Sequence, residues 1–71
     1  MITLKYRAKA PEVYTLCEML HKLGYAVKIS DSFTLEVDAA VKDFQKKNAL
    51  VSDGIVGMKT WQVLLDQSYK I

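Results

Sequence analysis

The segment 40–61 constrains the fold of this chain more than any other part of the sequence. It opens with a helical pattern over 40–45 and ends where another helix starts. The irregular sequence between these helices contains the pair Asp53-Gly54, which predicts a defined turn, because Gly adopts positive φ and an Asp carboxylate accepts hydrogen bonds from nearby amides. The connection 48–57 is too long for a minimal link and too apolar to remain in solvent. We therefore expect a packed, irregular loop between two helices.

Apolar residues recur at helical spacing in three segments, which predicts helices over about residues 11–23, 35–47 and 58–67. The chain is short enough to be a single domain over 1–71. The fold class expected is therefore all-α, a compact three-helix bundle with long structured loops. The buried stripes of the three helices are expected to contain Val13, Leu16, Cys17, Leu20, Leu23, Val37, Ala40, Val41, Phe44, Trp61, Leu64 and Leu65.

The expected helix ends carry residues suited to them. Pro11 suits the first turn of a helix, where its missing N–H leaves no hydrogen bond unmade. Thr34 can cap the second helix through its hydroxyl. Gly24 is expected to stop the first helix in a left-handed conformation, and Asn48 tolerates the same conformation after the second. The three helix starts are 24 and 23 residues apart, which indicates a weak internal repeat.

Two further segments are expected to be extended. Residues 1–10 alternate apolar and polar side chains, which fits either a strand or an extended arm laid across the core. Residues 25–29 are β-prone but short, and we expect a connector with Tyr25 and either Val27 or Ile29 turned inward. A short extended N-terminal arm thus completes the expected fold.

Composition excludes several classes of protein. Hydrophobic residues make up 51% of the chain and charged residues 25%, which is typical of a globular domain. One cysteine and one histidine cannot form a disulfide or a four-ligand zinc site, so we expect no metal and no cofactor. No apolar run approaches the roughly 20 residues that span a bilayer, and the N-terminus lacks the apolar segment of a signal peptide. Localisation is therefore expected to depend on a longer chain or on another route.

The net charge of +2 is small, and three of the cations, Lys5, Arg7 and Lys9, lie in the first nine residues. The rest of the chain mixes both signs. This does not make the basic face of a nucleic-acid binder, and we interpret these three residues as a solvated terminal arm.

Neither candidate for catalysis is favoured. Cys17 and His21 are four residues apart on one helix, as a thiolate–imidazole pair requires, but no third group follows, and free cysteine usually behaves as a small buried hydrophobe. Asp38 and Asp43 are a pair of acids of the kind that hydrolyse glycosides, yet both have lysine neighbours and read as solvated charges. We expect no enzymatic activity from these residues.

Polar residues around the Asp53-Gly54 turn form the best candidate binding site. Carboxylate and amide groups can accept or donate hydrogen bonds to sugar hydroxyls and peptide groups, although Asp53 can equally serve to hold its own turn. Trp61 can stack on a sugar ring, but an aromatic residue at helical spacing is more often part of the core. The ligand-binding residues predicted are Asp53, Gly54, Gln45, Asn48, Thr60 and Tyr25.

The chain resembles the type 1 peptidoglycan-binding domain family, which is attached to cell-wall hydrolases and phage lysins. The resemblance runs from Leu4 to Leu64, and its specific part is Asp53-Gly54-Ile55-Val56-Gly57 followed by Thr60-Trp61. It is supported by Pro11-Glu12-Val13, Leu16, Leu20, Leu23-Gly24-Tyr25, Phe33, Ala40-Val41-Lys42, Phe44-Gln45 and Leu50.

The resemblance implies a three-helix module that binds peptidoglycan, through glycan or stem peptide, without cleaving it. It also implies attachment to a catalytic domain that acts on the wall. We expect a monomer located at the bacterial cell wall, in the periplasm or outside the cell, and the charge and hydropathy of the chain predict no nucleic acid or membrane as partner. The sequence departs from the family at Cys17, where glutamine is usual, at Val37 and Met58, and at Arg7, Ala10 and Thr34, where glycine is usual. Arg7 and Lys9 make the first loop more cationic than is usual in the family, which suggests anionic wall polymers or stem-peptide carboxylates as ligands.

Two alternatives belong to other functional classes. A protein-interaction module could share the fold without binding the wall. A helix-turn-helix DNA binder also has three helices, but its turn is normally three or four residues, against the ten of 48–57, and its recognition helix needs clustered cations.

Overall fold

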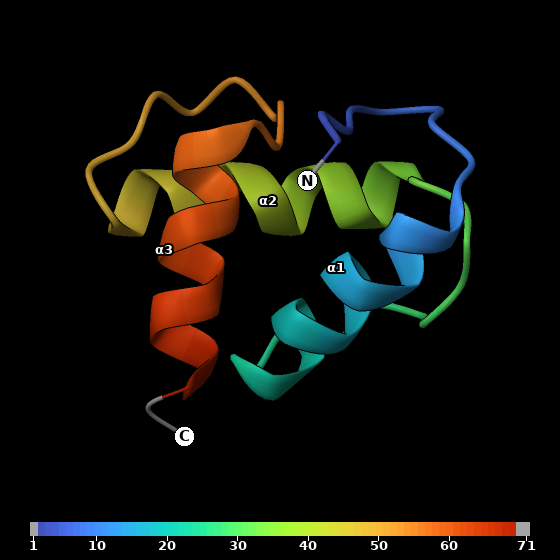
Figure 1. Cartoon of the computed structure of the whole chain (residues 1–71), viewed down its shortest axis with the longest axis horizontal. Coiled ribbons are helices and arrows are strands. Elements are labelled where there is room, and N and C mark those ends of the chain that lie inside the picture. The colour runs from blue at the N-terminus through green and yellow to red at the C-terminus, as the bar shows by residue number, and fades with distance from the viewer. Residues whose placement is uncertain (1, 70–71) are drawn as a thin grey trace.

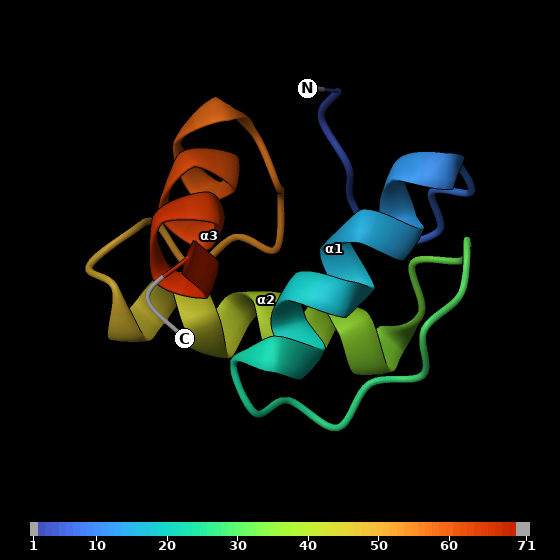
Figure 2. The same cartoon turned by 60° about the horizontal axis from the view of Figure 1, so that its bottom comes forward.

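The computed structural model describes residues 2–69 and contains three helices (Figure 1): α1 (Pro11–Lys22), α2 (Leu35–Lys47) and α3 (Met58–Tyr69). Relative to the expected bounds, α1 ends one residue earlier and α3 extends two residues further. Helices α1 and α3 cross the same side of α2 (Figure 2), and α1 packs against both of the others. The all-α, three-helix fold expected from the sequence is confirmed.

The start of each of the first two helices follows from the residue placed there. Pro11 occupies the first turn of α1, and the hydroxyl of Thr34 accepts a hydrogen bond of 3.3 Å from the Val37 amide at the start of α2. Both features match the sequence prediction. Amides in the first turn of a helix lack partners within the helix. The Thr34 hydroxyl supplies a partner for the Val37 amide, and Pro11 has no N–H that would need one.

Helices α1 and α2 end in the same way, but with different residues. Gly24 follows the C-cap of α1 with φ of 97°, as expected, and Ala49 follows the C-cap of α2 with φ of 57°. The expectation that Asn48 adopts the left-handed conformation is wrong by one residue. Asn48 is the C-cap itself, with φ of −107°, and the left-handed residue of such an ending follows the cap.

One hydrophobic core joins the three helices. Positions 23 or 24 residues apart are buried together, such as Cys17, Val41 and Leu64, each of which is 0% exposed. The internal repeat therefore appears in the packing. The core comprises Leu4, Val13, Leu16, Cys17, Leu20, Val27, Phe33, Val37, Ala40, Val41, Phe44, Val56, Trp61 and Leu64.

The N-terminal residues lie across the connection between α1 and α2 and the connection between α2 and α3, and they do not form a sheet with them. Leu4 and Val56 exchange two backbone hydrogen bonds, of 3.1 Å and 2.7 Å. Further along, the Arg7 amide donates to the Phe33 carbonyl, and the Phe33 amide donates to the Ala8 carbonyl, both at 2.9 Å. Of the two possibilities left open by the sequence, the structure shows an extended arm laid across the core.

The connector after α1 turns one side chain inward. Val27 is 6% exposed, whereas Ile29 is 44% exposed and faces solvent. Tyr25 is half-buried and packs against the edge of the core. This segment brings Tyr25 next to the C-terminal half of α2.

Candidate functional site

The side chain of Gln45 organises the loop between α2 and α3 from inside. It is 1% exposed, and its amide oxygen accepts a 2.9 Å hydrogen bond from the Gly54 amide. Its amide nitrogen lies 2.9 Å from the Ile55 carbonyl and 3.2 Å from both Asp53 Oδ1 and Thr60 Oγ1. A buried amide with this many partners fixes the loop in one conformation.

The Asp53-Gly54 turn is held by the same network. Asp53 Oδ1 accepts a 2.9 Å hydrogen bond from the Ile55 amide, so the carboxylate stabilises its own turn. Gly54 has φ of 79° and is buried against α2, where a Cβ atom would lie 2.6 Å from Asp38 Oδ1. The positive φ therefore favours glycine, and any larger residue would also have to displace the Asp38 side chain.

A shallow hollow of about 370 Å³, here called the loop pocket, lies beside this turn. Asp53 is exposed at it, while the Thr60 side chain is 5% exposed. Its rim includes two strongly exposed apolar side chains, Val51 and Met58. The loop pocket is lined by Gln45, Leu50, Val51, Asp53, Ile55, Gly57, Met58, Lys59 and Thr60.

A second hollow, of about 260 Å³, lies where the C-terminal ends of α1 and α2 approach α3. The amide of Asn48 is on its wall and donates a 2.8 Å hydrogen bond to the Phe44 carbonyl. Its other polar groups come from Tyr25, Lys47 and Gln67. This helix-end pocket is lined by Leu23, Gly24, Tyr25, Phe44, Lys47, Asn48 and Gln67.

Charges on α2 hold the Tyr25 ring at this pocket. The Tyr25 hydroxyl donates a 2.7 Å hydrogen bond to Asp43, and Lys47 forms a 3.1 Å ion pair with the same carboxylate. The Lys47 ammonium also lies 5.9 Å from the centre of the Tyr25 ring. Burial, together with the hydrogen bond to Asp43 and its charge, raises the pKa of Tyr25 to about 12. The hydrogen bond from Tyr25, followed by that from Lys47, lowers the pKa of Asp43.

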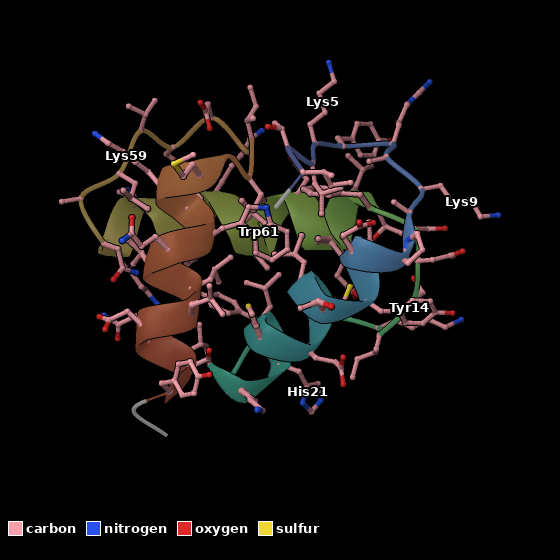
Figure 3. All side chains as sticks on the ribbon, viewed as in Figure 1. Lys5, Lys9, Tyr14, His21, Lys59 and Trp61 are labelled. Atoms are coloured by element: carbon pink, nitrogen blue, oxygen red, sulfur yellow. The ribbon has the colours of Figure 1, made fainter. Side chains whose placement is uncertain are left out.

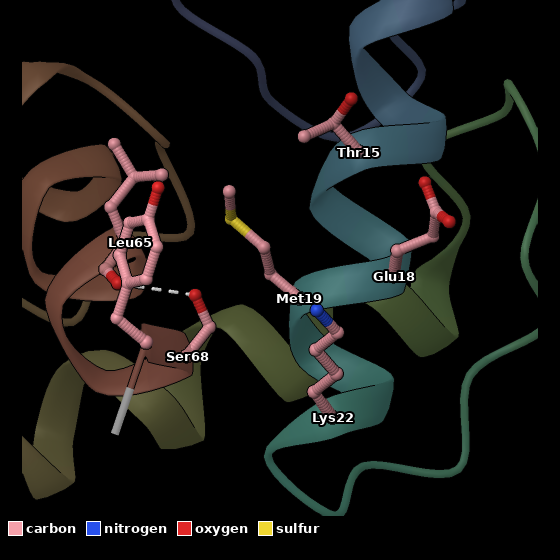
Figure 4. A pocket seen from close by; sticks show the side chains of 7 residues that line it. Thr15, Glu18, Met19, Lys22, Leu65 and Ser68 are labelled. Carbon is pink, nitrogen blue, oxygen red and sulfur yellow. Dashed lines mark hydrogen bonds between the residues drawn. The ribbon is translucent and has the colours of Figure 1, made fainter. Parts of the chain in front are cut away.

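A third hollow, of about 290 Å³, separates α1 from α3 (Figure 4). Met19 reaches toward Leu65 across it, and Ser68 donates a 3.2 Å hydrogen bond to the Leu65 carbonyl. None of the residues predicted to bind a ligand lines this hollow.

The structure divides the predicted site residues between two places. Gln45, Asp53, Gly54 and Thr60 form one hydrogen-bonded cluster at the loop, and three of these four are buried. Tyr25 and Asn48 line the helix-end pocket.

Sequence reasoning missed Lys47 and Gln67 at the helix-end pocket. Lys47 was available from the sequence, because Phe44, Lys47 and Asn48 have the spacing of one helix face. Gln67 comes from α3, and no local pattern connects it to α2.

The residues considered for catalysis are accounted for by structure. Cys17 is fully buried, with its sulfur 3.7 Å from the Ser30 carbonyl, while His21 is exposed (Figure 3). Asp38 pairs with Lys42 at 3.1 Å, as Asp43 does with Lys47. Within residues 2–69, no group of three or more potential metal ligands is present, and no helix has the length and apolarity needed to cross a membrane.

Trp61 belongs to the core. It is 3% exposed, and its indole N–H donates a 2.7 Å hydrogen bond to the Ile2 carbonyl (Figure 3). Stacking of this ring on a sugar would need the arm to move away first.

Comparison with solved structures finds the same fold in a peptidoglycan-binding protein, a phage endolysin and the SleB N-terminal domain. A peptidoglycan-binding protein of Clostridioides difficile, solved with glutamine hydroxamate, is 40% identical with a TM-score of 0.87, over 89% of this chain and 40% of that one. The endolysin of Burkholderia phage AP3 is 33% identical with a TM-score of 0.85, over 89% of this chain and 24% of that one. The SleB N-terminal domain is 29% identical with a TM-score of 0.90, over 94% of this chain and 93% of that one.

This chain therefore spans less than half the length of the first two proteins and nearly all of the SleB domain. No curated protein matches its sequence significantly. The family model described as "Putative peptidoglycan binding domain" matches residues 9–64, which include the whole loop pocket and every residue of the helix-end pocket except Gln67. The module that this model describes binds and does not catalyse. The chain belongs to the peptidoglycan-binding domain family.

Proposed function

We propose that this domain contacts the wall through the helix-end pocket and holds a covalently attached hydrolase or lysin on its peptidoglycan substrate. The observation that carries the function is the family match over 9–64, which covers all three helix starts and the loop 48–57. The Burkholderia phage endolysin supports the tether, because its matching region is 24% of a longer chain. The site of action would be the cell wall.

The chemistry of the helix-end pocket fits peptidoglycan. The amides of Asn48 and Gln67 both donate and accept hydrogen bonds, which suits N-acetyl groups and peptide bonds. The Lys47 ammonium can pair with a stem-peptide carboxylate. The Tyr25 ring, fixed by Asp43, offers an apolar surface with a polar edge, as aromatic residues at binding sites commonly do.

The buried loop cluster has a different role in this proposal. Gln45, Gly54 and Thr60 are turned inward and would act on a ligand only by fixing the loop that follows α2. Asp53 is the exposed member of the cluster and remains a candidate for direct contact at the loop pocket. No observation favours the protein-interaction or the DNA-binding alternative.

The test is sedimentation of the folded domain with insoluble peptidoglycan. Replacing Asn48 or Gln67 with Ala should weaken binding by about 2- to 10-fold each, which corresponds to one lost hydrogen bond. Gln62→Ala is the matched control, because Gln62 is an exposed glutamine on the same helix as Gln67 but outside the helix-end pocket.

Three results distinguish the parts of the proposal. If the wild-type domain stays in solution while folded, the function is wrong. If the wild-type domain binds but both pocket variants bind equally well, the helix-end pocket is the wrong site. An NMR titration with defined muropeptides would then map the site, and shifts around Asp53 would point to the loop pocket.

A further inference from the structure

The positive charge of this domain is concentrated on a short segment that the helix-end pocket does not use. Residues 5–9, here called the basic arm, carry Lys5, Arg7 and Lys9, all of them exposed. Subtracting these three charges from the net charge of +2 leaves −1 for the rest of the chain. Lys5 and Lys9 point away from the body of the molecule (Figure 3), and none of the three side chains forms an ion pair with a described residue.

The basic arm is held in place by backbone hydrogen bonds on both sides. Before it, Leu4 pairs with Val56; after it, the Ala10 amide donates to the Asp31 carbonyl at 3.1 Å. Within it, Arg7 and Ala8 exchange backbone hydrogen bonds with Phe33. These cations therefore project from a fixed backbone, so a ligand that binds them does not have to order a loose tail.

Arg7 lies at the tip of a turn within this arm. The Ala8 amide donates a 2.9 Å hydrogen bond to the Lys5 carbonyl, and Arg7, the third residue of this turn, has φ of 78°. Gly is the residue preferred there, since a side chain in the left-handed region costs about 1–2 kcal/mol. The guanidinium lies 5.4 Å from the centre of the exposed Tyr6 ring, which restricts its orientation. A planar guanidinium held in this way can form paired hydrogen bonds to a phosphate.

The basic arm and the helix-end pocket lie at opposite ends of α1. The arm precedes Pro11, and the pocket begins at Leu23, just past the helix. A helix of 12 residues is about 18 Å long, so one ligand group cannot occupy both places. Two contacts on the same wall would reinforce each other, because the first raises the effective concentration of the second.

We propose that the basic arm binds a phosphodiester polymer linked to the bacterial wall, as a second contact beside the helix-end pocket. This inference rests on the proposed function, which places the domain on the wall. A duplex nucleic acid fits the surface less well, because three cations on one arm are fewer than the basic face of a duplex binder, and α3 supplies only Lys59 near its start.

The experiment compares a triple variant of the arm with a control of equal charge. The arm variant is Lys5→Gln, Arg7→Gln and Lys9→Gln. The control is Lys22→Gln, Lys28→Gln and Lys46→Gln, which removes the same charge from exposed residues elsewhere. Each protein is sedimented with intact wall and with the same wall after hydrofluoric acid has removed the phosphodiester polymer, over a series of salt concentrations. Soluble poly(glycerol phosphate) serves as competitor, and circular dichroism checks the fold.

We expect the wild type and the control to bind intact wall about tenfold more tightly than stripped wall, and poly(glycerol phosphate) to remove this difference. The arm variant should bind both walls equally, with a slope of log affinity against log salt shallower by about 2, as for three phosphate contacts at about 0.7 each in flexible polyanions. If the arm variant binds intact wall as the wild type does, the inference is wrong.

Two further results separate this inference from the proposed function. If the arm affects binding to intact wall while stripped wall binds no variant at all, the inference stands and the proposed peptidoglycan contact fails. If single-stranded DNA or an anionic vesicle competes as well as poly(glycerol phosphate), the arm is a general polyanion surface and the specific proposal is overturned.

Discussion

Gly24 and Ala49 occupy equivalent positions after two helices, and only one of them is the residue that such a position favours. At α1, the Tyr25 amide bonds to the Leu20 carbonyl and the Gly24 amide to the His21 carbonyl. At α2, the Leu50 and Ala49 amides make the corresponding bonds. Both are Schellman endings, whose left-handed residue is usually glycine. The structure thus contains its own comparison between glycine and alanine.

Ala49→Gly is expected to stabilise the domain by about 0.5–1 kcal/mol, because it removes the cost of a left-handed alanine, partly offset by a more flexible unfolded chain. Gly24→Ala should destabilise it by a similar amount for the same reason. Urea denaturation measures both as shifts of the midpoint at constant slope. A loss of stability in Ala49→Gly would show that the strain at this residue is not relieved by glycine.

Titration of Tyr25 is coupled to Asp43. Because the folded pKa of Tyr25, about 12, is above the ordinary value of 10, its contribution to stability is complete below pH 10 and is lost as the pH rises toward 12. Asp43→Asn should bring the pKa of Tyr25 down toward 10, as followed by the NMR shift of Tyr25 Cζ. Asp31→Asn is the control and should leave it unchanged. An unchanged Tyr25 pKa in Asp43→Asn would leave burial as its sole cause.

The pKa of the Asp43 carboxylate is shifted in the opposite direction, so its effect on stability is expected at low pH. The pKa of Asp43 lies below its usual value of 3.8, so its contribution to stability is present above that value and is lost as the pH falls through the folded pKa. Tyr25→Phe removes the main cause and should raise the pKa of Asp43, as measured by carboxyl NMR titration. If the pKa stays low in Tyr25→Phe, Lys47 is the dominant cause.

At the scale of elements, the helices were easier to predict than the loop they support. Each helix carries its own apolar stripe, so local spacing was sufficient. Gln45 is four residues after the buried Val41, and this spacing already places it on the inner face of α2. Its partners, however, lie 8 to 15 residues later, in the loop and in the first turn of α3, and only the folded structure shows that its amide is used internally.

The Gln45 side chain therefore holds more of the loop between α2 and α3 than its place in the sequence indicates. Gln45→Leu leaves the Gly54 amide and the Ile55 carbonyl without their partner, and should destabilise the domain by about 2–4 kcal/mol. The measurement is urea denaturation, together with hydrogen exchange at Gly54. Gln62→Leu, an exposed glutamine on α3, should change stability by about 0.5 kcal/mol or less. Equal effects of the two variants would contradict this role for Gln45.

At the scale of the whole molecule, the extended N-terminal arm, which includes Leu4 and the basic arm, was the part of the fold that the sequence left undecided. Leu4 pairs with Val56, more than fifty residues away, and alternation of apolar residues in the arm says nothing about such a partner. The predicted site residues are divided between two places for the same reason, because contacts between distant segments cannot be read from local patterns. Tyr25 and Asn48 meet Gln67 only because α3 returns across the ends of the other two helices.

Because Leu4 of this arm is part of the core, shortening its side chain should lower the free energy of unfolding strongly even though it lies near the N-terminus. Leu4 is 1% exposed, and Leu4→Ala is expected to destabilise the domain by about 2–4 kcal/mol, through lost burial and the cavity that remains. Ile2→Ala, at a side chain that is 45% exposed, should have a much smaller effect. Thermal unfolding of both variants checks this, and a Leu4→Ala variant as stable as Ile2→Ala would show that the arm is dispensable.

The same arm determines how the domain would carry mechanical load. A pull on Ile2 reaches the core through the hydrogen bond from Trp61 and the two bonds between Leu4 and Val56. These bonds join the arm to α3 and to the loop that precedes it, so force from the N-terminal side would reach both directly. Resistance to stretching would therefore depend on these three hydrogen bonds and one buried leucine.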